Sequence, residues 1–306
     1  YLSRDKETYF MKQELEKCGI LEENVSLKKL NTYRIDTKTK YLLHPRTVEE
    51  VQRFFRLVQE KNLSYFVLGN GSNVVLSDTT YPGVIVKLDQ FKSITYHDEQ
   101  VVAGAGVMIN FLSRDILAHG LSGLEWASGI PGTVGGCVFG NAEAYKVSTF
   151  DVLKEVMVVT PDSEILSISS DDLEYGYRTS SFKTHPGCII LSATFQLKKG
   201  NKEESFQLIK ERFLRRASSQ PLDYPSAGSV FRNPSSSLAS WQLISELQLK
   251  GKRINDAMVS VKHANFIINL GNATGKDIRS LIQLIHDEVE RVYHIDLILE
   301  QEFKDW

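Results

Sequence analysis

Residues 64–78 read SYFVLGNGSNVVLSD, and this stretch decides which kind of nucleotide-binding fold the chain can have. The apolar run before Gly69 predicts one strand, and the valine-rich run after Asn73 predicts another. A Rossmann dinucleotide-binding motif needs a helix directly after its glycines, so the strand–loop–strand order excludes that fold. A glycine loop between strands can still hold a phosphate, because its backbone N–H groups can approach an anion closely. Taken alone, such a loop is more often only a turn.

The residues before this loop predict a strand, a helix and a strand. The run YLLH at 41–44 is strand-like, and Thr47 to Glu50 has the pattern of a capping box. Apolar residues then recur at helical spacing as far as Val58. This order predicts a right-handed crossover that joins a parallel pair of strands.

The residues after the loop contain a second glycine-rich stretch. Strand-like runs cover about 84–107, and a helix is expected over 108–120. Residues 123–136 then read GLEWASGIPGTVGG, with five glycines and a proline in fourteen residues, so we expect no regular element there. The interleaved apolar side chains indicate burial, and buried irregular backbone needs partners for its N–H groups. A polar cofactor would supply them, and a purely structural loop is the alternative.

The rest of the chain predicts mixed helices and strands with a boundary near residue 200. A charged helix is expected over 5–20. Three strand-like runs lie within 151–200, followed by a basic helix over 203–217 and a Pro-rich loop over 220–234. A helix over 239–249, a strand pair at 257–261 and 265–270, and a final helix from Thr274 complete the chain. The fold class expected is therefore α+β.

Composition excludes several classes of function. The 306 residues suit two or three domains, and the formal net charge of -2 provides no electrostatic case for a nucleic acid or membrane partner. The 3 cysteines form no CxxC pair, which favours a reducing cytoplasm over a disulfide framework. No apolar run approaches the roughly 18 residues of a membrane helix. The charged first residues lack the apolar segment of a signal peptide, and Met11 is a candidate start residue.

A search for catalytic motifs leaves three scattered polar residues. The chain contains no P-loop, no HExxH and no G-x-S-x-G, and its histidines do not pair at metal-ligand spacing, so we expect no metal. Ser229, Arg178 and Glu302 lie in or beside apolar or turn-bounded runs. They could serve as proton donor, anion clamp and second acid. Each alone is more often a turn serine, a salt-bridged arginine or an exposed glutamate.

Six motifs in a fixed order resemble one enzyme family. They are GNGSN at 69–73, GLEWASGIPGTVGG at 123–136, YRTSSFK at 177–183, QPLDYPSAGSVFRNP at 220–234, KHANFIIN at 262–269 and LEQEF at 299–303. Together they resemble the UDP-N-acetylenolpyruvoylglucosamine reductases, which make UDP-N-acetylmuramate for peptidoglycan. The resemblance covers about residues 27–304, and the short path from Pro234 to Trp241 is similar to the shorter subtype of the family.

The resemblance implies a flavoprotein with three parts. The family has the FAD-binding fold of the vanillyl-alcohol oxidase type, with two α+β subdomains around the flavin and a C-terminal α+β domain for substrate. On this chain it implies a helical leader at 1–26, an FAD-binding domain at 27–200 split near residue 90, and a substrate-binding domain at 201–306. We expect a cytoplasmic monomer that uses FAD and NADPH.

The resemblance also implies residue roles. Arg178 would hold and polarise the substrate carboxylate, Ser229 would deliver a proton to C2, and a protonated Glu302 would assist at the same carboxylate. The residues expected to bind FAD are Gly69, Asn70, Gly71, Ser72, Asn73, Gly129, Ile130, Pro131, Gly132, Thr133, Gly135 and Gly136. The residues expected to contact the nucleotide-sugar substrate are Tyr177, Arg216, Arg232, Asn233 and His263.

The implied reaction has two halves. NADPH reduces FAD, and hydride then passes to C3 of the enolpyruvyl group while negative charge develops toward the carboxylate. Arg178 and Glu302 would stabilise that charge in place. Serine is a weak acid. The enolate that Ser229 would protonate is a strong base, and this makes the proton transfer feasible.

Some positions depart from the family pattern and leave alternatives open. Glu143 and Lys146 stand where the family usually has glycines near the flavin, which would be costly if those positions need positive φ. Another flavin-dependent oxidoreductase of the same superfamily, with flavin attached through Cys137 or a histidine, is one alternative. A flavin-binding paralogue without activity is the other.

Overall fold

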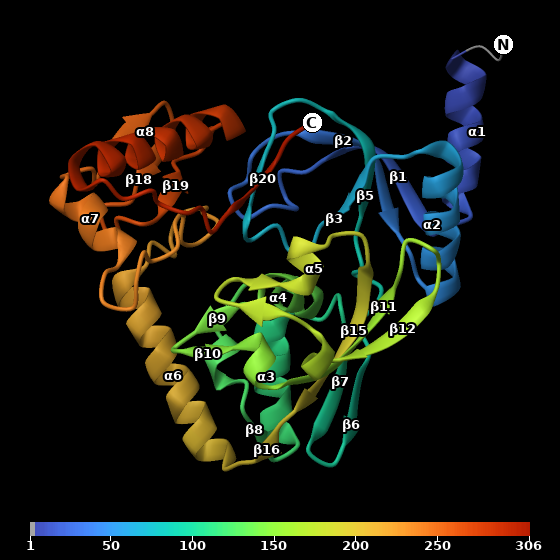
Figure 1. Ribbon diagram of the computed structural model, residues 1–306, viewed down its shortest axis with the longest axis horizontal. Helices are drawn as coiled ribbons and strands as arrows, with labels where there is room; N and C mark the ends of the chain where they lie inside the picture. Colours follow the sequence, from blue (N-terminus) through green and yellow to red (C-terminus); the bar gives the residue numbers. More distant parts are fainter. Residues whose placement is uncertain (1–3) are drawn as a thin grey trace. The chain divides into compact units, whose positions relative to one another are not determined.

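A computed structural model describes residues 4–306 of the chain, which form two compact units (Figure 1). Unit 1 contains the residues up to Asn24, Lys40–Gly69 and Gly83–Phe213. Unit 2 contains Val25–Thr39, Asn70–Pro82 and Leu214–Trp306. Among the helices of residues 4–306, none combines the length and the apolar run needed to cross a lipid bilayer.

The N-terminal elements form a four-stranded sheet with the order β1-β2-β5-β3. The strands of this sheet are β1 (Ile20–Ser26), β2 (Lys38–His44), β3 (Tyr65–Val67) and β5 (Tyr81–Val86). Two helices lie in the same part of the chain, α1 (Arg4–Glu16) before β1 and α2 (Val48–Lys61) between β2 and β3. The predicted pairing of the strands on either side of α2 is wrong, because β2 and β3 are not neighbours: β3 pairs in parallel with β5, which lies between β3 and β2 in the sheet. The strand–loop–strand prediction for 64–78 is confirmed, because β4 (Val74–Leu76) follows β3 with no helix between them.

The start of α2 follows the sequence prediction only in part. The Thr47 hydroxyl accepts the Glu50 N–H at 3.3 Å, as an N-cap should. The Glu50 carboxylate accepts the Arg46 N–H at 2.6 Å. Its pKa is lowered mainly by the Arg46 side chain, and the backbone N–H groups of Arg46 and Thr47 contribute as well, so the acidic side of the expected capping box also involves Arg46.

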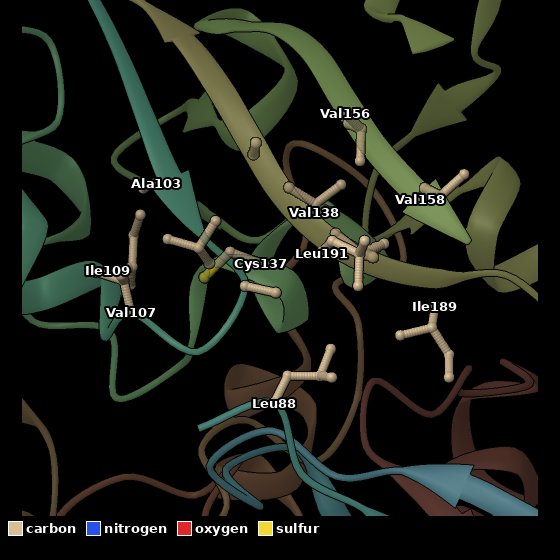
Figure 2. Close-up of a cluster of buried hydrophobic side chains, with 14 of the residues drawn as sticks. Leu88, Ala103, Val107, Ile109, Cys137, Val138, Val156, Val158, Ile189 and Leu191 are labelled. Carbon is tan, nitrogen blue, oxygen red and sulfur yellow. The ribbon is translucent and has the colours of Figure 1, made fainter. Parts of the chain in front are cut away.

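A five-stranded antiparallel sheet with the order β12-β11-β15-β7-β6 forms the centre of unit 1. Its strands are β6 (Ile94–His97), β7 (Gln100–Gly104), β11 (Leu153–Val159), β12 (Ile165–Ser169) and β15 (Ile189–Gln196). Helix α4 (Val134–Gly140) packs against β15 and β7. Figure 2 shows Cys137 and Val138 of this helix among side chains of β7, β11 and β15, so α4 is anchored in the main core.

Short elements occupy the loops between these strands. They are α3 (Ile109–Ala118), β8 (Leu121–Ser122), η1 (Glu125–Ala127), β9 (Glu143–Ala144), β10 (Val147–Ser148), η2 (Thr149–Asp151), η3 (Ser170–Asp172), β13 (Tyr175–Gly176), β14 (Thr179–Ser180), α5 (Ser181–Thr184) and β16 (Lys198–Lys199). The expectation of no regular element in 123–136 is wrong at two places, η1 and the start of α4. Helix α4 can begin at Val134 because the Thr133 hydroxyl caps it by accepting the Gly136 N–H at 3.2 Å.

The C-terminal part of the chain begins with α6 (Lys202–Ser219), which runs from unit 1 into unit 2. The remaining elements of unit 2 are α7 (Ser240–Glu246), β17 (Arg253–Ile254), β18 (Ala257–Val259), β19 (Ile267–Asn269), α8 (Gly275–Tyr293) and β20 (Glu302–Lys304). The Thr274 hydroxyl and the Asp277 carboxylate form a capping box at the start of α8. Strand β20 pairs in parallel with β4, with Glu302 opposite Val74, so the last residues of the chain lie beside the end of the first glycine loop.

Candidate functional site

The two glycine-rich motifs meet within unit 1. A Cβ atom on Gly69 would lie 2.9 Å from the Thr133 hydroxyl, so glycine is needed for this close approach. The Lys87 ammonium donates to the Gly69 carbonyl at 2.6 Å, and burial lowers the pKa of this lysine. A hydroxyl, an ammonium and exposed glycine backbone are a suitable donor set for a diphosphate. Sequence reasoning missed Lys87, because a lysine inside a strand-like run usually reaches solvent.

The backbone of the second motif is largely satisfied by the protein itself. The N–H groups of Val134 and Gly135 donate to the carbonyls of Val107 and Ala105 at 2.8 and 3.0 Å. The Gly136 N–H donates to the Thr133 hydroxyl. These groups therefore need no cofactor, which corrects that part of the sequence argument. A cofactor could still lie against Gly136, because a Cβ atom there would meet only the Thr133 hydroxyl, at 3.3 Å.

The remaining residues of the first loop, Asn70–Asn73, belong to unit 2, where two of them have structural roles. Gly71 has φ +64°, and a Cβ atom on it would lie 2.3 Å from the Leu30 carbonyl oxygen. The Asn73 carbonyl accepts the Glu302 N–H at 2.9 Å, and its side-chain amide donates to the Glu300 carbonyl at 3.0 Å. Asn73 thus holds the strand that carries Glu302. Its predicted contact with FAD stays a prediction.

Arg178 lies in the two-residue turn of the β13–β14 hairpin. Gly176 pairs with Thr179, and Arg178 has φ +58° at the second turn position. This left-handed conformation favours glycine and costs a larger residue about 1–2 kcal/mol. The guanidinium carbon of Arg178 lies 6.0 Å from the ring centre of the exposed Tyr177. A non-glycine residue kept in a strained position is a reason to expect a function for it.

The Arg178 hairpin is fixed to the C-terminal end of α4. The Ser180 hydroxyl donates to the Phe139 carbonyl at 2.7 Å, and the Asn141 amide donates to the Gly176 carbonyl at 2.9 Å. The rings of Phe150 and Tyr175 stack with their centres 4.4 Å apart. Asn141 lies beyond the predicted irregular stretch 123–136, in a segment for which the sequence predicted no helix, so its role as helix cap was not visible in the sequence.

Ser229 and Glu302 lie on neighbouring segments of unit 2. Ser229 forms an isolated bridge with Phe266, and the Val230 carbonyl accepts the Glu300 N–H at 2.9 Å. The buried Gln301 amide donates to the Gly228 carbonyl at 3.2 Å. The Ser229 loop and the segment leading into β20 therefore run side by side. Gln301 joins them, and sequence reasoning gave it no role.

Glu302 forms an ion pair with Lys304 two residues along β20. The Lys304 ammonium lies 3.0 Å from Oε2 of Glu302. The side chain of Glu302 is 19% exposed, and that of Lys304 is 28% exposed. The Glu302 carboxylate, to which the resemblance assigns a role at the substrate, thus already has a cationic partner within the protein. Its role and its protonation stay predictions.

The predicted substrate contacts of unit 2 already have protein partners. The Asn233 side chain accepts the Ser240 N–H at 3.2 Å at the start of α7, and Arg216 donates to Gln220 at 3.0 Å along α6. His263 accepts the Asn265 N–H at 3.2 Å, and burial lowers its pKa. The Arg232 N–H donates to the Ile298 carbonyl at 2.8 Å. Their contacts with substrate stay predictions.

The departures at Glu143 and Lys146 fall in the β9–β10 hairpin. Ala144 pairs with Val147, and the two turn residues Tyr145 and Lys146 have φ +57° and +62°. Two left-handed residues are the signature of a type I′ hairpin turn. The concern about positive φ therefore applies to Lys146, whereas Glu143 lies in the strand β9 outside that region.

The environment of Cys137 bears on the alternative of a covalently attached flavin. Burial raises the pKa of the Cys137 thiol to about 12, so it is poorly suited to become the thiolate that covalent flavin attachment would need.

On α8, the ligand atoms of His286, Asp287 and Glu290 lie within 4.8 Å of one another. His286 also contacts Asp296 at 2.7 Å in an exposed pair.

Comparisons with known proteins agree with the order of the motifs. A family model described as the UDP-N-acetylenolpyruvoylglucosamine reductase C-terminal domain matches residues 220–304, and an FAD binding domain model matches 39–169. The UDP-N-acetylenolpyruvoylglucosamine reductase of Alkaliphilus oremlandii is 37% identical over 275 residues, covering 90% of each chain. That of Clostridium botulinum (strain Eklund 17B / Type B) is 38% identical over 280 residues, covering 92% of this chain and 91% of its own.

A solved structure shows the same likeness in three dimensions. The crystal structure of UDP-N-acetylenolpyruvylglucosamine reductase from Thermus caldophilus aligns with a TM-score of 0.80 and 33% identity. The alignment covers 94% of this chain and 100% of that one, so it includes both units and the α+β fold predicted from the sequence. On the identity and coverage of these relatives, the chain belongs to the UDP-N-acetylenolpyruvoylglucosamine reductase family.

Proposed function

We propose that this protein uses NADPH and FAD to reduce UDP-N-acetylglucosamine enolpyruvate to UDP-N-acetylmuramate, a step of peptidoglycan synthesis. The observation that carries the proposal is the side-by-side course of the Ser229 loop and the Glu302 segment in unit 2. The Ser229 hydroxyl and the Glu302 carboxylate, which lie far apart in the sequence, are therefore carried by neighbouring backbone segments. Membership of the reductase family supports the same activity.

The proposed roles follow from the chemistry of the side chains. FAD, when bound, supplies the hydride that reaches C3 of the enolpyruvyl group. Arg178 binds the substrate carboxylate and stabilises the negative charge that develops there. Ser229 donates the proton that C2 receives. Glu302 stabilises the same carboxylate as a proton-sharing partner when substrate displaces Lys304 from it.

The binding residues divide between two parts of the chain. We propose that residues 27–200 hold FAD, with Gly69, Thr133 and Gly136 against the diphosphate and Lys87 nearby as a positive charge. Residues 201–306 would hold the nucleotide sugar. The contact between Gly69 and Thr133 supports the first assignment, because it joins the two glycine motifs at one place.

Replacing Ser229 by alanine tests the proposal. We expect FAD reduction by NADPH to keep its rate, and reoxidation by the enolpyruvyl substrate to slow by about 10²–10⁴-fold, the usual contribution of a general acid. Stopped-flow absorbance of the flavin measures both half-reactions. Ser226→Ala, in the same loop, is the matched control and should behave like the unmodified protein. A Ser229→Ala protein with near-normal substrate turnover would rule out this role.

The coarser context of the enzyme can be proposed as well. The net charge of -2 and the sparse cysteines support a cytoplasmic protein without a nucleic acid partner. We propose that it acts as a monomer. Light scattering of the purified protein at micromolar concentration tests this, and a stable dimer would contradict it.

A further inference from the structure

We propose that Asn141 is the positioning residue that holds Arg178 in its working place. The proposal rests on the proposed function, because it concerns how the carboxylate-binding arginine is presented. Asn141 is 3% exposed and forms the C-cap of α4 with φ +43°. It contacts no reacting group in this proposal and acts through the β13–β14 hairpin.

The side-chain amide of Asn141 joins two segments. Its Nδ2 donates to the Gly176 carbonyl at 2.9 Å, one residue before the turn that contains Arg178. Its Oδ1 accepts the Phe150 N–H at 3.2 Å, at the 3-10 turn η2. Both the donor and the acceptor of the amide are therefore used, and a carboxylate of the same shape could satisfy only the second.

The turn beyond this anchor stores strain. Arg178 has φ +58°, and relaxation of such a residue toward negative φ would rotate the guanidinium away from its present direction. The anchor on the Gly176 carbonyl holds the strand immediately before the turn, and Ser180 holds the strand after it through the Phe139 carbonyl. Both anchors end on the last turn of α4 and its cap.

Helix α4 connects this anchor to the proposed FAD-binding cluster. Its N-cap is Thr133, which lies against Gly69, and its C-cap is Asn141. The helix is packed into the main core through Cys137 and Val138 (Figure 2). The seven residues of α4 thus set the distance between the proposed diphosphate-binding backbone and the hairpin of Arg178. Asn141 connects the end of the helix to that hairpin.

The test is Asn141→Asp, which keeps the shape, the acceptor for Phe150 and the tolerance for positive φ, but places a carboxylate oxygen against the Gly176 carbonyl. We expect reoxidation of reduced FAD by the enolpyruvyl substrate to slow by about 10–100-fold, since a displacement near 1 Å can cost this much. FAD reduction by NADPH should change less than about twofold. Asn62→Asp is the matched control, because Asn62 is the left-handed C-cap of α2 in the same unit.

Two further readouts separate positioning from general damage. In the protein without FAD, amide hydrogen exchange should accelerate at residues 175–180 in Asn141→Asp and stay unchanged elsewhere in the five-stranded sheet. In an Arg178→Ala background, Asn141→Asp should cost less than about twofold, because the residue it positions is absent. An equal loss with and without Arg178, or unchanged exchange at 175–180, would overturn the proposal.

Asn141→Gly keeps the test decisive if the aspartate variant does not fold, because glycine accepts φ +43° without strain and also removes the anchor. The unmodified protein provides a separate test of the proposed function. If the unmodified protein does not oxidise NADPH with the enolpyruvyl substrate, the proposed function fails, whereas the exchange experiment still reports on the anchor.

Discussion

Unit 1 contains two short hairpins with the same kind of backbone cost and different consequences. The β9–β10 hairpin turns through Tyr145 and Lys146, and the β13–β14 hairpin turns through Tyr177 and Arg178. Lys146 and Arg178 both have φ near +60°, where glycine would be free of strain. Lys146 is exposed, and Arg178 is half-buried beside the last turn of α4. The same local strain is thus kept in one turn without a visible catalytic role and in another with a proposed one.

The first hairpin has a different tertiary attachment. The Tyr145 hydroxyl donates to the Arg212 carbonyl on α6 at 3.1 Å, and the guanidinium carbon of Arg212 lies 4.6 Å from the Tyr145 ring centre. Its turn is therefore specified by Tyr145, and Lys146 has only to accept the conformation. The comparison shows that a residue with positive φ indicates a function where the fold positions that residue's own side chain. In the β9–β10 hairpin the fold instead positions the side chain of its neighbour, Tyr145.

The largest expected effect concerns the charge and shape of Arg178. Arg178→Lys should lower kcat/KM for the enolpyruvyl substrate by about 10²–10³-fold, because a lysine cannot bind a carboxylate through two parallel donors. Lys146→Arg, the matching change in the other hairpin, should stay within about twofold. Steady-state NADPH oxidation measures both. Equal losses in the two variants would remove the functional distinction between the hairpins.

The second prediction concerns the pH dependence of the stability of unit 1, which contains both hairpins. His44 bonds Asp89 at 2.8 Å and Glu22 at 3.0 Å, and the Asp89 hydrogen bond raises the pKa of His44. Because the folded-state pKa lies above the unfolded one, this stabilisation is complete below about pH 6.5 and is lost as the pH rises through the folded-state value. Lys87 and Lys92 also act on Asp89 from the segment after β5.

His44→Gln should therefore destabilise the protein by about 1 kcal/mol at pH 6, a value reduced for solvent screening since Glu22 is 54% exposed. The difference from the unmodified protein should shrink as the pH rises above the folded-state pKa. Urea denaturation at several pH values measures it. A difference that grows with pH would contradict the assignment of a charged His44.

The third prediction separates stability from activity at one residue. Arg178→Gly should raise the free energy of unfolding by about 1 kcal/mol, because the left-handed strain is relieved, while activity is lost. Urea denaturation and NADPH oxidation measure the two effects. Arg178→Ala, which keeps the strain and loses the guanidinium, is the control and should gain no stability. A glycine variant that is less stable than the alanine variant would mean that Arg178 is not strained.

The smallest expected effect is at Lys146. Lys146→Gly should raise the free energy of unfolding by about 0.5 kcal/mol, since glycine is preferred in a type I′ turn but costs chain entropy in the unfolded state. Activity should stay within about twofold, which is the clearest contrast with Arg178→Gly. Loss of activity without loss of stability would show that Lys146 has a direct role after all.

The sequence by itself determined the local elements and the fold class. The glycines and valines of 64–78 required strand–loop–strand, and Thr274 with Asp277 marked the start of α8, because caps and turns depend on neighbouring residues. The motif order was enough to predict the family. It also placed Arg178 in a segment with tyrosine and glycine, without showing that its φ is positive.

Only the tertiary structure decided how these motifs are joined. Gly69 meets Thr133, Asn73 holds the Glu302 strand, Gln301 ties that strand to the Ser229 loop, and Asn141 holds the Arg178 hairpin. Each of these contacts links segments distant in sequence, and hydrogen bonds of that kind leave no periodic pattern for local reasoning to detect. The same holds for the N–H groups of Val134 and Gly135, which donate to the carbonyls of Val107 and Ala105, acceptors that no local pattern predicts.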